Sequence, residues 1–133
     1  KMHTLGHGFV PEPIHAGGLR YHGMAPLVSH VYELGLVEAI AVPQLECFAG
    51  AIKFARSEGI VPAPEPTHAI AAAIREALAC KESGEDKTIL TALCGHGHLD
   101  LASYDRYLRG EMRDLELSND VIKAAMLDVP EIG

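Results

Sequence analysis

Residues 88–93, TILTAL, form the segment that most restricts what this chain can fold into. They are a short and nearly continuous apolar run, which is typical of a strand covered on both faces in a parallel sheet. The run is followed at once by the sequence Cys94-Gly95-His96-Gly97-His98. We therefore expect a buried strand that ends in a glycine turn carrying a thiol.

The segments around this strand show helical spacing. Pro43 suits the start of a helix, where its missing N–H costs nothing, and Gly59 suits its end. Further helices are predicted over residues 24–34, 67–80, 103–109 and 118–126, the last capped by Ser118. Residues 37–42, VEAIAV, predict another short strand. Helices alternating with strands predict an α/β fold: a partial parallel sheet with flanking helices. Two or three strands are few, so we expect part of a larger fold.

Composition excludes several functional classes. The chain of 133 residues carries a net charge of −7 and no basic run, which argues against general binding of nucleic acid. It has no run of about 20 apolar residues and no signal-peptide pattern, so we expect no membrane segment and a cytoplasmic location. Its three cysteines form no CxxC pair, so neither a disulfide framework nor a zinc ribbon is indicated.

The chain also divides by composition along its length. Residues 1–26 are rich in glycine, proline and histidine and lack periodicity, which is uncommon unless such a stretch lines a site. We therefore predict an irregular segment that faces the active site over residues 1–26. An α/β core is expected over residues 27–110, and an acidic tail over residues 111–133.

Three side chains are candidates for a binding site. Cys94 is predicted at the carboxyl end of a strand, where open α/β sheets bind ligands, although a buried free cysteine is the plainer interpretation. Glu65 lies between two prolines just before a helix, where a charged carboxylate is favoured; it could equally be a simple complement to the helix dipole. Arg20 follows two glycines and offers a forked donor for carboxylate or phosphate, or is an ordinary surface arginine.

Two other functions are open from the residues alone. His3 and His7, or His96 and His98, could ligate zinc, but no carboxylate or thiol stands at a familiar spacing around them. The chain could also be a non-catalytic α/β interaction module with residues 1–26 as its docking surface. Our expectation is that no metal site is present.

Three segments, in order, resemble a known family: HTLGHGFVPEPIHAGGLRYHG, EGIVPAPEPTHA and LCGHGHLD. They are similar to the C-terminal third of the tryptophan synthase beta chain, and more narrowly to its second-type branch. The resemblance covers nearly the whole chain and is specific through about Gly110. It implies the type II pyridoxal-phosphate fold and a lyase that makes L-tryptophan from indole and L-serine or O-phosphoserine.

The resemblance also implies roles for individual residues. Cys94 matches the family's hydrogen-bond donor to the pyridine nitrogen of the cofactor, with Gly95 beside it. Glu65 matches the glutamate next to the cofactor ring. Arg20 stands where the better-known branch has an aspartate that closes the site, and the change of sign suggests a more anionic leaving group. A thiol leaves the ring nitrogen largely neutral, which favours β-replacement.

Other parts of the family's active site have no match in this sequence. The Schiff-base lysine, the catalytic acid and the GGGSN phosphate loop belong to upstream segments, so we expect no catalytic residue in these 133 residues. The chain is expected to be inert alone and to need the N-terminal portion of the same enzyme. The family further implies a homodimer and a possible weak contact with an alpha chain.

Overall fold

The computed structural model describes residues 1–130, so the last three positions of the predicted acidic tail lie outside it. The chain divides into two compact units, one formed by Val42–Asp114 and the other by Lys1–Ala41 with the chain from Leu115 onward. This division neither tests nor replaces the predicted boundaries at residues 26 and 110. No helix in the described part of the chain is long and apolar enough to cross a membrane.

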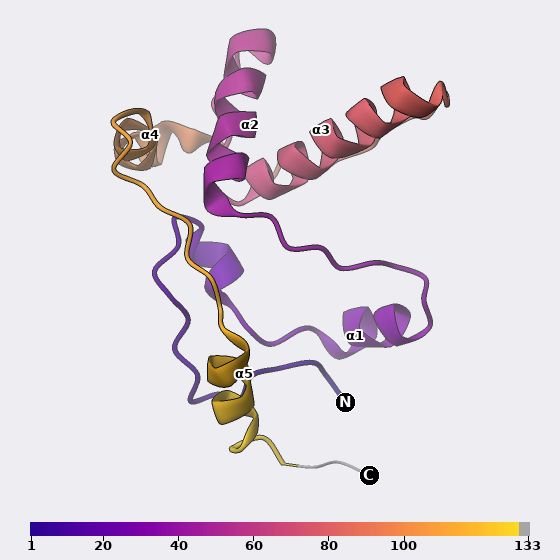
Figure 1. Cartoon of the computed structure of the whole chain (residues 1–133), viewed down its shortest axis with the longest axis vertical. Coiled ribbons are helices and arrows are strands. Elements are labelled where there is room, and N and C mark those ends of the chain that lie inside the picture. Colours follow the sequence, from indigo (N-terminus) through magenta and orange to yellow (C-terminus); the bar gives the residue numbers. More distant parts are fainter. Residues whose placement is uncertain (131–133) are drawn as a thin grey trace. The chain divides into compact units, whose positions relative to one another are not determined.

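The unit Val42–Asp114 is built on two helices, α2 (Gln44–Glu58) and α3 (Pro66–Ser83). Both predicted helices are confirmed, and each ends at a glycine in the left-handed conformation, Gly59 and Gly84. Their buried residues lie in their N-terminal halves. Figure 1 accordingly shows the two helices close together at their N-terminal ends and diverging toward their C-terminal ends.

A small aromatic core holds this unit together. Phe48 of α2 is 1% exposed and packs edge-on against Tyr104 of α4 (Leu101–Leu108), with ring centroids 5.1 Å apart. Tyr107, one turn further along α4, stacks on the same ring at 5.6 Å. Ala51 and Met112 complete the buried cluster. The core therefore fixes α4, and the short helix η2 (Gly97–Leu99) before it, to α2.

The other unit contains α1 (Pro26–Glu33), α5 (Asn119–Met126) and the short helix η1 (Gly17–Arg20). Two of the predicted helices are again confirmed. The Ser118 hydroxyl accepts a hydrogen bond from the Val121 N–H, as predicted for an N-cap. In the N-terminal segment, an isolated antiparallel bridge joins Thr4 to Gly23.

The predicted parallel sheet is not formed by this chain. Among residues 1–130 there is no β-strand, and residues 37–42 and 88–93 are both irregular. A strand exists only when a neighbour takes its backbone hydrogen bonds, and neither segment has such a neighbour here. The side chain of Leu90, predicted to be buried, is 95% exposed. The apolar pattern was detected correctly, but its partner strands are not supplied by these residues.

Candidate functional site

Two segments that are far apart in sequence pair with each other in the unit Val42–Asp114. Pro62 and His96 form an antiparallel bridge. The Ala63 N–H donates to the Gly95 carbonyl at 3.1 Å, and the Gly97 N–H donates to the Val61 carbonyl at 2.7 Å. Pro62 has no N–H to give, and it stands opposite His96 between these two hydrogen bonds, where none is needed.

Two glycines allow this close pairing. Gly95 has a φ of +115°, in the region that side-chain-bearing residues rarely adopt, and a Cβ there would lie 3.1 Å from the Cβ of Ala63. At Gly97 a Cβ would lie 2.4 Å from the Pro62 carbonyl oxygen and 2.9 Å from Val61. The glycines of the CGHGH turn are therefore required both by backbone conformation and by close contact.

Two of the predicted site residues lie next to the paired segments in sequence, one beside each segment. Cys94 directly precedes Gly95, and its side chain is exposed, with a free thiol. Glu65 follows Ala63 by two residues and is half-buried at the N-cap position of α3. The plainer interpretation of Cys94 as a buried core thiol is therefore wrong.

The turn that carries Glu65 is held by side chains that follow it. The buried Thr67 hydroxyl donates to the Pro64 carbonyl at 2.5 Å. The His68 Nδ1 lies 3.1 Å from the Pro64 carbonyl oxygen and 3.2 Å from that of Glu65. These contacts leave the Pro64–Glu65 backbone little freedom. A carboxylate on such a turn loses little conformational entropy when a ligand binds.

Arg20, the remaining predicted site residue, belongs to the other compact unit. It ends η1, and its Nη2 donates to the Pro11 carbonyl at 3.3 Å. Its Nε is buried and has no hydrogen-bond partner among residues 1–130. Its role toward a leaving group stays a prediction.

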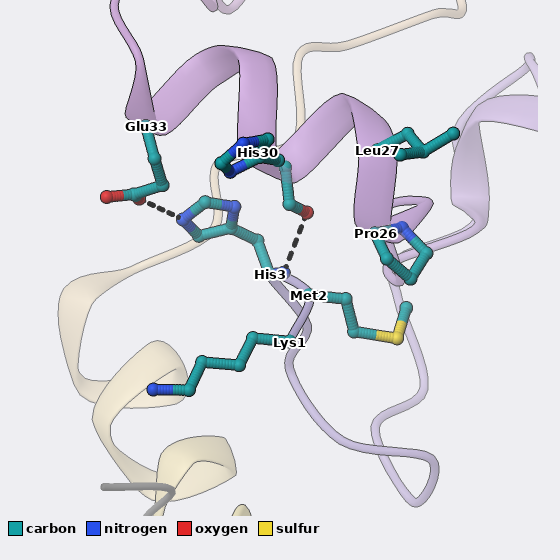
Figure 2. A pocket seen from close by; sticks show the side chains of 8 residues that line it. Lys1, Met2, His3, Pro26, Leu27, His30 and Glu33 are labelled. Carbon is teal, nitrogen blue, oxygen red and sulfur yellow. Dashed lines mark hydrogen bonds and ion pairs between the residues drawn. The ribbon is translucent and has the colours of Figure 1, made fainter.

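A pocket of about 550 Å³ lies between α1 and the N-terminal segment (Figure 2). The His3 ring points from that segment toward α1, where its Nε2 pairs with the Glu33 carboxylate at 2.9 Å. The backbone N–H of His3 donates to the Ser29 hydroxyl at 3.0 Å. These contacts attach the N-terminal segment to α1, and none of the predicted site residues lines this pocket.

The histidine pairs do not build a metal centre in the described residues. Within residues 1–130, no three His, Cys, Asp or Glu side chains converge as metal ligands. His96 and His98 have ring centroids 4.7 Å apart, and the His96 Nδ1 accepts a hydrogen bond from the His98 N–H. This bond uses His96 as the cap of η2 and leaves the histidine metal hypothesis without support.

The sequence analysis did not identify Tyr104, whose hydroxyl bonds to one of the two paired segments. The Tyr104 hydroxyl donates to the Pro62 carbonyl at 2.5 Å, across 42 residues, and both groups are buried. Burial, and secondarily the nearby Asp100, raise the pKa of Tyr104 to about 12, so the hydroxyl keeps its proton at neutral pH. The only signal in the sequence is the position of Tyr104 on the apolar face of a helix, which does not distinguish it from other core residues.

The chain is similar to proteins that share one name. It is 65% identical over 114 residues to the tryptophan synthase beta chain 2 of Aquifex aeolicus (strain VF5), covering 86% of this chain and 26% of that protein. To the tryptophan synthase beta chain 2 of Methanosarcina acetivorans it is 60% identical, covering 84% and 25%. To the tryptophan synthase beta chain of Thermococcus onnurineus it is 53% identical, covering 87% and 26%.

The extent of these matches limits what they show. The chain spans about a quarter of the length of the curated relatives it matches. No family model matches it. These three relatives are tryptophan synthase beta chains, so the comparisons support neither an interaction module nor a metal-binding domain.

Proposed function

We propose that this chain, which is 53–65% identical to tryptophan synthase beta chains over about a quarter of their length, forms the C-terminal wall of the cofactor site of an enzyme of that kind. The complete protein would join indole to L-serine or O-phosphoserine and release L-tryptophan, in the cytoplasm. The observation that carries the proposal is the pairing of residues 61–63 with 95–97, the segments next to Glu65 and Cys94.

The residues at this edge fit pyridoxal phosphate. The exposed Cys94 thiol offers a single weak hydrogen-bond donor, as a largely neutral pyridine nitrogen requires. Gly95 places no side chain beside the thiol, so a flat ring could approach the backbone closely. Glu65 would lie next to the ring, held by the turn described above. The bound cofactor would supply the electron sink for β-replacement.

Arg20 extends the proposal to the amino-acid substrate. Its guanidinium group is always charged and forks in a way that matches a phosphate group. We propose that it favours O-phosphoserine over L-serine by pairing with the phosphate that leaves. Its Nε, which is buried and has no hydrogen-bond partner in the described part of the chain, supports a role for the group in binding.

Exposed apolar side chains support the need for further polypeptide. In residues 88–93, Leu90 is 95% exposed and Leu93 is 41% exposed, although the segment has the composition of a buried strand. We propose that this segment becomes a strand of a parallel sheet when the remaining three-quarters of the enzyme supply its neighbours. The family's lysine and phosphate loop would come from the same portion, and the complete enzyme would be a homodimer.

A chimera tests this proposal. The corresponding quarter of the Aquifex aeolicus relative is replaced by this chain and the product is purified with pyridoxal phosphate. We expect the visible absorbance band of protein-bound cofactor, and formation of tryptophan from indole with O-phosphoserine or L-serine. The unaltered relative is the positive control. A folded chimera that shows neither the band nor tryptophan would contradict the proposal.

A further inference from the structure

We propose that Tyr104 is a positioning residue for the cofactor site: its hydroxyl holds the Pro62 carbonyl, and through it the two paired segments that carry Glu65 and Cys94. This inference rests on the proposed function. Tyr104 lies on α4, and in this proposal it acts through the Pro62 carbonyl and does not itself touch the cofactor.

The Pro62 carbonyl has few ways to be satisfied. The two hydrogen bonds that flank the bridge use the carbonyls of Val61 and Gly95, so the carbonyl of Pro62 takes no part in either. Pro62 is among the most completely buried residues in the chain. A buried carbonyl without a partner is costly, and the Tyr104 hydroxyl supplies the partner at 2.5 Å.

The donor is itself held in place. The Tyr104 ring is 5% exposed and packs edge-on against Phe48 at 5.1 Å. At the start of α4, the Tyr104 N–H donates to the Asp100 carbonyl at 3.3 Å. The packing of the ring and the backbone hydrogen bond therefore fix the position of the Tyr104 hydroxyl relative to Pro62. A donor fixed on both sides positions its acceptor more precisely than a flexible one.

On its other side the same carbonyl oxygen is in close contact with Gly97. A Cβ at that position would lie 2.4 Å from it. The Pro62 carbonyl oxygen thus contacts both the Tyr104 hydroxyl and Gly97. A displacement of this oxygen would therefore shift residues 61–63 and residues 95–97 together. Glu65 is three residues from Pro62, and Cys94 is three residues from Gly97. A small shift at this point therefore reaches both predicted cofactor contacts.

The test compares two tyrosine-to-phenylalanine changes on the same helix in the chimera. Y104F removes the hydroxyl that holds Pro62 and keeps the ring. Y107F, the matched control, removes a hydroxyl from a ring that also stacks on Phe48, whereas the hydrogen bond to Pro62 comes from Tyr104. We expect Y104F to shift the cofactor absorbance band and to lower kcat about tenfold, the size of one lost hydrogen bond. Y107F should do neither.

A second measurement uses the 133-residue chain without cofactor. Amide hydrogen exchange at Ala63 and Gly97, the two N–H groups of the bridge, should be about tenfold faster in Y104F and unchanged in Y107F. If Y104F does not fold, Gly97→Ala displaces the same oxygen from the other side and must shift the cofactor band.

The outcomes separate the two proposals. A chimera without a cofactor band overturns the proposed function and this inference with it. A chimera with the band, in which Y104F and Y107F have the same band position and kcat, overturns the role of Tyr104 alone. Lower thermal stability of Y104F with an unshifted band and full kcat would also overturn it, because that is the result of a purely structural contact.

Discussion

The Gly97 backbone lies so close to the Pro62 carbonyl oxygen that a methyl group on Gly97 would overlap it, at 2.4 Å. This contact joins the CGHGH turn to the segment before α3, and the predicted cofactor contacts stand on either side of it. The site therefore depends on a glycine as much as on any reactive side chain.

Gly97→Ala should destabilise the chain by about 1–3 kcal/mol, because the overlap is with backbone, which cannot rotate away. Urea unfolding measures the change in the free energy of unfolding. Gly50→Ala is the matched control in the same unit. Gly50 lies within α2, and a Cβ there would meet Ile74 of α3 at an ordinary 3.5 Å. Gly50→Ala should therefore raise the free energy of unfolding by about 0.5–1 kcal/mol. Equal effects of the two changes would contradict the close contact.

Stability should fall in alkaline solution. Burial raises the pKa of Cys47 from 9.0 to about 11 and that of Tyr104 from 10.0 to about 12. The folded state thus keeps both protons at a pH where the unfolded state has lost them. The stabilisation is complete below about pH 9 and is lost as the pH rises toward 12.

Urea unfolding at a series of pH values measures this loss. Y104F removes the tyrosine contribution, so its free energy of unfolding should fall less than that of the parent between about pH 10 and pH 12. Parallel curves for the two proteins would show that Tyr104 keeps an ordinary pKa.

The three thiols should react in the order of their exposure. Cys94 is exposed, Cys80 is half-buried, and Cys47 is 0% exposed between α2 and α3. Iodoacetamide, followed by peptide mass spectrometry, should label Cys94 first and Cys47 only after unfolding. In the chimera, pyridoxal phosphate should slow labelling of Cys94 and leave Cys80 unaffected. Equal protection of both would count against a cofactor contact at Cys94.

Substitution of Cys94 tests its proposed chemistry in the chimera. Cys94→Ser should keep most activity, because a hydroxyl donates the same hydrogen bond to the ring nitrogen. Cys94→Asp should abolish or divert β-replacement, because a carboxylate would favour the protonated nitrogen. Tryptophan formation and the cofactor spectrum measure both. Parental activity in Cys94→Asp would show that the thiol does not face that nitrogen.

Much of the local structure could be predicted from the sequence. Gly59 and the cap at Ser118 act within one or two turns, so the end of α2 and the start of α5 follow from nearby residues. α3 instead continues to Ser83, past the end predicted at residue 80. The strands predicted over residues 37–42 and 88–93 are not formed in the described residues, for the opposite reason. A strand depends on a partner, and an apolar pattern does not say whether the same chain supplies one.

The helices, the end of α2, the start of α5 and the motifs that resemble the tryptophan synthase beta chain could all be recognised in the sequence. The pairing of residues 61–63 with 95–97, and the tyrosine of α4 that donates to the Pro62 carbonyl, became visible only in the folded chain. The two kinds of interaction differ in how far apart in sequence their partners lie. Helix propensities and caps act over a few residues, whereas a hydrogen bond across 42 residues exists only once the core has formed around Phe48.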